Sequence, residues 1–154
     1  MTEEAQQPLF NIEKIYVKDL SLEVPNSPQV FLEREVPQVD VEIQTRDAKI
    51  DEGVHEVVLT VTVTAHHSDK TYFLAEASQA GIFQLRNIPD AEVGPILGIG
   101  CPNILFPYVR ETISDLVNRA GFPPVVLTPV NFEPIYQAKL QQQSSPQPAE
   151  PVTH

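Results

Sequence analysis

The sequence predicts an α+β fold, in which a four-stranded antiparallel sheet carries a long helix and a second C-terminal helix on one side. The first observation behind this prediction is that apolar and polar residues alternate at strand period through most of residues 9–85. The second is that a long helical pattern occurs only after residue 100. The third is that strands do not alternate with helices, as a parallel sheet requires, so antiparallel pairing is expected. At 154 residues the chain has the size of one domain with one core.

The first predicted strand, residues 9–24, changes the phase of its alternation twice. Apolar residues occupy even positions up to Ile12, odd positions at Ile15 and Val17, and even positions again from Leu20. A β-bulge, or a strand buried on both faces, explains such a change of phase. In the second half of this strand the acidic residues point away from the apolar ones, which predicts an acidic face on that side of the sheet.

A long crossover loop is expected at residues 25–37, where three prolines oppose a regular strand. This loop carries the apolar residues Val30, Phe31 and Val36. Such residues either line a groove or cover the core, and the sequence alone does not choose between the two.

The other three strands follow a simpler pattern. They are expected at residues 39–45, 54–65 and 71–85, joined by a charged turn at residues 46–53 and a hairpin loop at residues 66–70. The strand signal is strongest in residues 54–65, where Val, Leu and Ala alternate with Glu and Thr. In the last strand Leu74, Glu76 and Ser78 share one face.

The long helix is expected over residues 104–120, with Asn103 as its cap and Pro107 in its first turn, where a missing N–H costs nothing. Its apolar residues recur at helical spacing and form one stripe: Val109, Ile113, Leu116, Val117 and Ala120. Gly121, followed by two prolines at 123 and 124, predicts the end of this helix. The preceding residues 89–100 are rich in glycine and proline and are expected to form a short helix or an irregular connector.

The rest of the chain divides into a link, a helix and two polar ends. Residues after Pro124 predict an extended link, and residues 131–143 predict an amphipathic helix capped by Asn131. We expect residues 1–8 to be a disordered N-terminus, residues 9–143 to form the folded domain, and residues 144–154 to be a flexible tail.

Composition narrows the class of protein. The chain has 10 Lys and Arg against 21 Asp and Glu, a formal net charge of −11. This charge argues against binding nucleic acid and favours a basic partner, if any. A single cysteine excludes an internal disulfide framework, and the sequence shows neither a signal peptide pattern nor an apolar run long enough to span a membrane. We therefore expect a soluble cytoplasmic protein without membrane insertion.

Few residues indicate catalytic or metal chemistry. The sequence has no phosphate-cradling glycine loop, no paired-cysteine metal motif, no HExxH and no G-x-S-x-G, so neither a metal nor a cofactor is expected. The adjacent His66 and His67 would point to opposite sides of a strand or turn, which favours a plain loop over a metal site. Cys101, beside a helix N-terminus, is either a nucleophile with a lowered thiol pKa or a small buried residue. Because no companion histidine is evident, the buried residue is the favoured interpretation.

The carboxylates of the predicted acidic face allow two interpretations. Asp19 with Glu23, or Glu23 with Glu76, could form a general acid/base pair. An ordinary solvated sheet face is the more common situation, and a docking surface for a partner is the main functional alternative to it.

Four runs of residues, in order along the chain, resemble the SecB family of bacterial protein-export chaperones. They are IYVKDLSLEVPN at residues 15–26, QAGIF at 79–83, CPNILFPYVRE at 101–111 and LTPVNF at 127–132. The resemblance covers about residues 9–143, and the CPNILFPY run is highly specific. It implies the α+β fold predicted above, assembled as a homotetramer, a dimer of dimers with helices packed between the dimers. It also implies an ATP-independent chaperone, not an enzyme, that holds secretory preproteins unfolded without a cofactor and delivers them to the translocase motor SecA.

The resemblance also implies roles for individual residues. Those that match SecA-docking positions are Asp19, Glu23, Leu74 and Glu76. Those that match the apolar client-binding groove are Phe31, Val39, Val41, Ile43, Phe73 and Tyr108. Those that match strand positions linked to tetramer stability are Ala75, Ala77 and Gln79. The helix stripe with Ile113, Leu116 and Val117 is expected to serve both the core and the subunit interface.

Two departures from the family pattern and three alternative functions accompany this resemblance. Position 36 is Val where family members commonly carry Trp, and the tail SSPQPAEPVTH has one acidic side chain where the family tail is often acidic and contacts the zinc-binding tail of SecA. The alternatives are a SecB-like chaperone of a toxin–antitoxin pair, a small cysteine-dependent enzyme and a purely structural oligomer.

Overall fold

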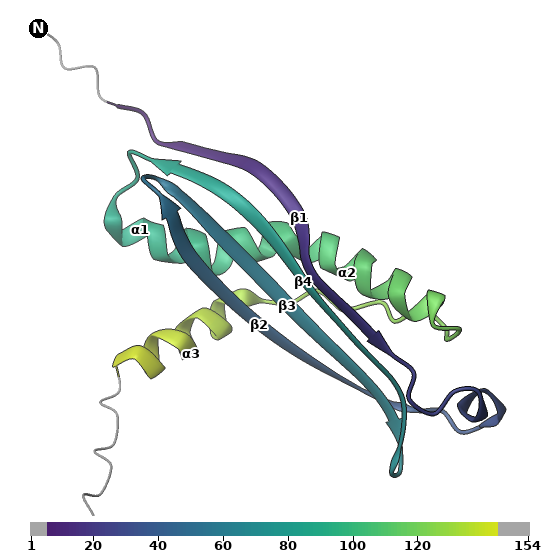
Figure 1. The fold of residues 1–154 in the computed structure, drawn as a ribbon. Coiled ribbons are helices and arrows are strands. Elements are labelled where there is room, and N and C mark those ends of the chain that lie inside the picture. Colours follow the sequence, from purple (N-terminus) through teal and green to yellow (C-terminus); the bar gives the residue numbers. More distant parts are fainter. Residues whose placement is uncertain (1–5, 145–154) are drawn as a thin grey trace, which may run out of the picture.

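The computed structural model describes residues 6–144, which form one antiparallel sheet with helices on one side of it (Figure 1). The strands are β1 (Leu9–Glu23), β2 (Gln38–Asp51), β3 (Val54–His67) and β4 (Lys70–Arg86), in the spatial order β1-β4-β3-β2. This confirms the predicted α+β architecture. The predictions for residues 1–5 and 145–154 lie outside the described residues, and the predicted tail loses Ser144 to the last helix.

The crossover follows from the strand order. β1 pairs with β4 on one edge of the sheet, whereas β2 forms the other edge, so the chain must pass from one edge to the other between them. Residues 24–37 make this passage and include the short 3-10 helix η1 (Gln29–Leu32). Val30 within it is 2% exposed and packs into the core, while its neighbour Phe31 stays half exposed.

β1 contains two β-bulges, one between Ile12 and Lys14 and one between Val17 and Asp19. Each bulge adds one residue and so reverses the phase of the alternation. With both bulges in place, the alternating apolar residues from Phe10 to Leu22 pair with β4 residues of the helix side, for example Ile12 with Phe83 and Leu20 with Ala77. The bulge predicted from the change of phase is confirmed.

Two of the predicted turns were too long. β2 continues through the charged residues 46–51, and the turn predicted at 46–53 is reduced to Glu52 and Gly53. Likewise the hairpin loop predicted at 66–70 is reduced to Ser68 and Asp69. The prediction was wrong because charged side chains on an edge strand remain in solvent while the backbone still pairs with its neighbour.

The helical region begins earlier than predicted. α1 (Asp90–Pro95), the π-helical turn η2 (Ile96–Gly100) and α2 (Cys101–Arg119) follow one another without a break. The short helix is thus present, but Asn103 is not a cap and Pro107 lies inside α2. The N–H of Cys101 reaches the carbonyl of Ile96, a wide turn that keeps the chain helical between prolines at 95 and 102.

The far end of α2 agrees with the prediction. Gly121 adopts φ +92°, a left-handed conformation that favours glycine and ends the helix. After an extended link, α3 (Phe132–Ser144) begins with its predicted cap, because the N–H of Glu133 donates to Oδ1 of Asn131 at 3.1 Å. α3 lies against η2, where the ring of Tyr136 occupies space that only a glycine at position 98 leaves free.

The core lies between α2 and the two central strands. Buried residues of the helix, among them Leu105, Val109 and Ile113, face buried residues of β3 and β4 such as Leu59 and Phe83. The sheet and the helices therefore form two layers, and within residues 6–144 no helix lies on the other face of the sheet (Figure 1).

Candidate functional site: an apolar groove and an acidic sheet face

The helix layer leaves apolar side chains of both edge strands exposed. On β2, Val39 and Val41 are 41% and 46% exposed, although they lie in register with buried residues of β3. On β1, four residues on the helix side are exposed to a similar degree: Phe10, Ile12, Val17 and Leu20. We call this second group the β1 stripe. Both edges thus offer apolar surface to another polypeptide.

A groove of about 370 Å³ opens beside the start of β2. Its walls come from the crossover segment, the starts of β2 and β4, and the link after α2. The lining is almost entirely apolar, and its members are Val30, Phe31, Glu33, Val36, Pro37, Val39, Tyr72, Phe73, Phe122, Pro123 and Val125. Such a cavity suits apolar side chains of a bound chain better than a polar metabolite.

Phe122 is the centre of the aromatic floor of this groove. Its ring centroid lies 5.2 Å from that of Phe31, 5.1 Å from that of Phe73 and 6.2 Å from that of Tyr72. These distances are typical of favourable aromatic pairs. The left-handed residue Gly121 directs the chain so that Phe122 packs under the crossover segment.

The sequence-derived groove residues divide into three groups. Phe31, Val39 and Phe73 line the cavity. Val41 and Ile43 continue along the same face of β2 beyond it, which extends the apolar surface. Tyr108 lies on α2, is 46% exposed and is not among the lining residues.

Six lining residues were not predicted as groove residues from the sequence, namely Glu33, Pro37, Tyr72, Phe122, Pro123 and Val125. The only signal for Phe122 was its position directly after the glycine that ends α2, where an aromatic residue turns back onto its own domain. No pattern in the sequence shows that this residue meets the crossover segment, which lies about ninety positions earlier.

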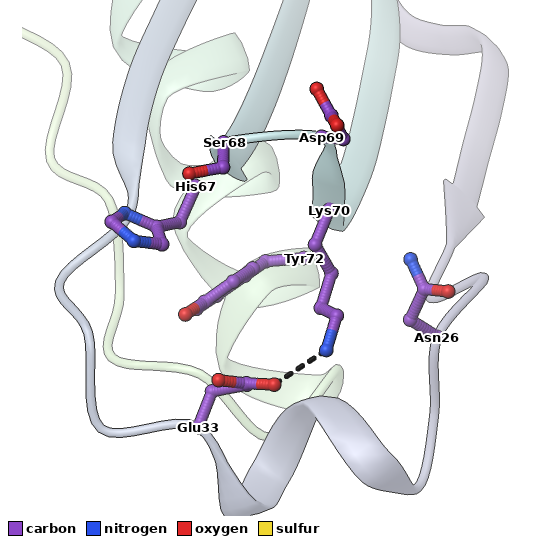
Figure 2. Close-up of a pocket in the computed structure, with 7 residues that line it drawn as sticks. All are labelled: Asn26, Glu33, His67, Ser68, Asp69, Lys70 and Tyr72. Atoms are coloured by element: carbon purple, nitrogen blue, oxygen red, sulfur yellow. Dashed lines mark hydrogen bonds and ion pairs between the residues drawn. The ribbon is translucent and has the colours of Figure 1, made fainter.

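A polar pocket of about 390 Å³ adjoins the groove at the β3–β4 turn (Figure 2). Its lining residues are Asn26, Glu33, His67, Ser68, Asp69, Lys70 and Tyr72. Glu33 and Tyr72 line both spaces, so they form the partition between them. Nζ of Lys70 lies 2.5 Å from Oε1 of Glu33, and this contact lowers the pKa of the Glu33 carboxyl.

The opposite face of the sheet is polar and acidic near the same end. The register places three rows of side chains across it: Asp19, Ser78, Thr60 and Gln44; Ser21, Glu76, Thr62 and Glu42; and Glu23, Leu74, Thr64 and Asp40. Glu76 lies diagonally next to Glu23; Glu23 is exposed and Glu76 is half-buried. Thr62 donates a hydrogen bond of 2.8 Å to Glu76. The four residues assigned to docking, including Asp19 and Leu74, therefore share one accessible surface.

Basic residues border this acidic surface on the other half of the face. Lys18 and Arg46 line a depression of about 470 Å³ together with Asp19 and Glu76. Nζ of Lys18 lies 2.7 Å from Oε1 of Glu56, and the hydroxyl of Tyr16 donates to the same carboxylate. The hydrogen bond from Lys18 and that from Tyr16 lower the pKa of Glu56, while burial and then the hydrogen bond to Glu56 raise the pKa of Tyr16 to about 12.

The residues assigned to the oligomer interface are buried inside the single subunit. Ala75, Ala77 and Gln79 are at most 4% exposed, and Ile113, Leu116 and Val117 are at most 8% exposed. The amide of Gln79 donates to the carbonyl of Tyr16 at 3.1 Å, which links β4 to the β1 edge, while its Oε1 is buried without a partner in this subunit. These six residues therefore lie in the core, beneath the surface of the subunit.

The candidates for chemistry have ordinary structural surroundings. Cys101 is fully buried, and burial raises its pKa to about 12, which opposes a reactive thiolate. Nε2 of His66 lies 2.7 Å from Oδ2 of Asp40 at the sheet edge. Among residues 6–144 there is no cluster of three potential metal ligands. Nor does any helix of these residues have the length and apolar character that crossing a membrane requires.

A two-layer α+β fold with an open apolar groove and an accessible polar sheet face has the surfaces that a polypeptide-binding chaperone requires. Comparison with known proteins specifies which one. The family model "Preprotein translocase subunit SecB" matches residues 3–143, and the chain belongs to the SecB family. It is 61% identical to the "Protein-export protein SecB" of Nitrosomonas eutropha over 99% of this chain and 96% of that protein. It is also 61% identical to the protein of the same name from Chromobacterium violaceum, covering 90% of this chain and 92% of that one.

A solved structure shows the same fold at low identity. The SecB-like chaperone of Mycobacterium tuberculosis, in complex with a ChAD peptide from an antitoxin, superposes with a TM-score of 0.64 and 17% identity over 79% of this chain and 91% of that one. At this identity the likeness concerns the fold alone. The relatives of high identity are export proteins, so the chain is a protein-export chaperone, and this interpretation is supported over that of a toxin–antitoxin chaperone.

Proposed function

We propose that this chaperone holds secretory preproteins unfolded by burying their apolar segments in the groove beside β2. The observation that carries the proposal is the cavity of about 370 Å³ with its aromatic floor, continued by the exposed Val41 on the same strand face. Burial of apolar area contributes roughly 25 cal/mol per Å² and has no directional preference, so many sequences can bind. Neither ATP nor a cofactor nor a chemical step takes part in such capture, and the protein acts in the cytoplasm.

A charge placed on the apolar surface that continues the groove along β2 tests this proposal. Val41→Arg should weaken capture of an unfolded preprotein, because a guanidinium would have to be buried beside the client's apolar groups. Ile50→Arg is a matched control, since Ile50 is 53% exposed on the same strand but near the opposite end. The measurement is the suppression of aggregation of an unfolded preprotein. Equal protection by wild type and Val41→Arg would contradict the groove assignment.

The acidic sheet face is proposed as the docking surface for SecA. Supporting this, Asp19, Glu23 and Glu76 lie close together and accessible around Leu74, on the face away from the groove. A motor bound there could approach while the client is still held. Glu23→Lys should weaken binding to SecA several-fold and leave client capture unchanged. Glu52→Lys, in the exposed β2–β3 turn, is the control of equal charge change; equal loss in both variants would reject a specific surface.

A homotetramer, arranged as a dimer of dimers, is proposed from the surfaces that one subunit leaves uncovered. The β1 stripe lies on an edge strand, so a second copy could cover the apolar groups and extend the sheet. The outer face of α2 carries Arg110, Glu111 and Asp115, which suits a more polar contact between dimers. Light scattering measures the mass; a monomer at micromolar concentration would contradict the assembly. Four copies would present several grooves to one client, which raises avidity.

A further inference from the structure

One wall of the groove is a short segment with few attachments, residues 33–37, which we call the strap. Glu33, Val36 and Pro37 of the strap line the groove, and Val36 is 86% exposed. In the described part of the chain, the last backbone hydrogen bond of the crossover before β2 runs from the N–H of Glu33 to the carbonyl of Val30, at 3.1 Å. The residues between Glu33 and β2 therefore depend on side chains for their position.

Two side chains from the start of β4 hold the strap. Nζ of Lys70 contacts Oε1 of Glu33 at 2.5 Å, and the hydroxyl of Tyr72 donates to the carbonyl of Glu35 at 3.0 Å. In Figure 2, Lys70 and Glu33 point toward each other across the mouth of the polar pocket, with Tyr72 beside them. The two contacts fix the strap at its first and third residues.

The preceding part of the crossover is anchored differently. Val30 is 2% exposed in the core, and the amide of Asn26 donates to the carbonyl of Thr71 at 2.8 Å. The turn around η1 is thus held by burial and by backbone hydrogen bonds, whereas within the described residues the strap has no backbone hydrogen bond beyond that of Glu33 and is largely exposed. Loss of the two side-chain contacts would free the groove wall without unfolding the crossover.

We propose that Lys70 and Tyr72 are positioning residues that hold the strap so that the groove stays open and preorganised for a client. This inference rests on the proposed function of the groove. Neither contact requires the client, because both act through the strap. A free strap would have to be ordered again on binding, and that conformational entropy would reduce affinity. The ion pair also keeps the carboxylate of Glu33 engaged with a cation at the boundary of an otherwise apolar cavity.

The test combines variants of both contacts with a matched control. Lys70→Met removes the cation and keeps the aliphatic chain, and Tyr72→Phe removes only the hydroxyl. Lys49→Met is the control, since it breaks an exposed ion pair with Glu52 (3.0 Å) at the other end of the sheet. The ligand is a dye-labelled peptide rich in leucine and phenylalanine, and its affinity is measured by fluorescence anisotropy on the full-length assembly. We expect affinity to fall about two- to fivefold for each variant and further for the pair, with no change in the control.

A second readout reports on the strap without any client. The chain has no tryptophan, so Val36→Trp provides a single fluorescent probe in the groove wall. Its emission should shift to longer wavelength when Lys70→Met is added, and amide hydrogen exchange should accelerate at Glu33, the strap residue whose N–H donates to the carbonyl of Val30. Lys70→Arg should restore both readouts to wild-type values, as should the reversed pair Glu33→Lys with Lys70→Glu.

The outcomes separate this inference from the proposed function. If wild type does not bind the peptide, the groove proposal fails, while emission and exchange still decide whether Lys70 and Tyr72 position the strap. If wild type binds and the double variant binds as tightly as Lys49→Met, the positioning role is overturned. Unchanged exchange of the Glu33 amide in the double variant would also overturn it.

Discussion

β1 and β2 are the two edges of one sheet, and they leave similar apolar side chains exposed in different surroundings. Leu20 of β1 and Val41 of β2 are both 46% exposed on the helix side. Around Val39 the crossover segment and the link after α2 form a groove that Val41 continues along the strand, whereas none of the groove-lining residues belongs to β1. Exposure alone therefore does not separate the proposed client site from the proposed subunit contact, and the neighbouring loops are what differs between them.

The largest expected effect comes from introducing a carboxylate on one edge or the other. Leu20→Asp should break the assembly, because a carboxylate would be buried against a second copy of the β1 stripe. Val41→Asp, at equal exposure, should leave the mass unchanged and weaken client capture. Light scattering and an aggregation assay on both variants check the comparison. Loss of the tetramer in Val41→Asp, or its persistence in Leu20→Asp, would show that the two edges have been assigned the wrong way round.

Removal of the aromatic floor should have the next largest effect. Phe122→Ala removes the ring shared by Phe31, Tyr72 and Phe73, so we expect a loss of about 2–3 kcal/mol in the free energy of unfolding and strongly reduced client binding. Phe10→Ala on the β1 stripe is the comparison, since Phe10 stacks on Phe83 at 5.8 Å but is 41% exposed. Phe10→Ala should lower the free energy of unfolding, measured by urea unfolding, by less than Phe122→Ala does. It should leave peptide binding to the groove, measured by titration, unaffected.

A smaller effect is expected at the polar contacts that hold β1 to the sheet. Tyr16→Phe removes a hydroxyl that donates to Glu56, and should cost about 1 kcal/mol in unfolding free energy. Because the pKa of Glu56 is lowered, its contribution is present at neutral pH and is lost as pH falls below the ordinary value of 4.5 and through the folded-state pKa. Urea unfolding from pH 7 to pH 3 measures this, and Glu56→Gln should flatten that part of the curve. The same acid sensitivity in Glu56→Gln would contradict the role of this carboxylate.

The smallest effect is expected where α3 contacts β2. Nζ of Lys139 donates to the carbonyl of Thr45 and lies 3.3 Å from its hydroxyl oxygen. Lys139→Met should lower the free energy of unfolding by about 0.5–1 kcal/mol. It should also loosen the packing of α3 on β2 without changing client affinity. Hydrogen exchange in α3 measures this. A fall in client affinity as large as that of Val41→Asp would show that the client-binding surface includes α3.

Much of the fold could be predicted because strand and helix patterns are local. The change of phase at Ile15 and again at Leu20 predicted the bulged strand, and Gly121 predicted the end of α2. The start of the helical region could not be predicted from glycine and proline content, because the wide turn η2 between two prolines depends on packing against α3. The charged residues 46–51 were predicted to form a turn. They form part of β2 instead, because pairing along an edge strand does not require apolar side chains.

The site was predictable to a smaller extent. Asp19, Glu23 and Glu76 could be placed on one face from strand phase, since the register of an antiparallel sheet preserves it. Phe122 could not be placed in the groove, because its partners Phe31 and Phe73 are distant in sequence. The contacts of Lys70 and Tyr72 with the strap were likewise invisible before the crossover was positioned.

The sequence by itself determined which face of each strand is apolar, where α2 ends and which family the chain resembles, since each of these depends on residues close together in the chain. The tertiary structure alone decided which apolar residues are covered. A helix with its side chains is about 10 Å wide and strands lie about 4.8 Å apart, so one helix covers about two strands of a sheet. β3 and β4 are covered here, whereas the apolar faces of β1 and β2 remain partly exposed.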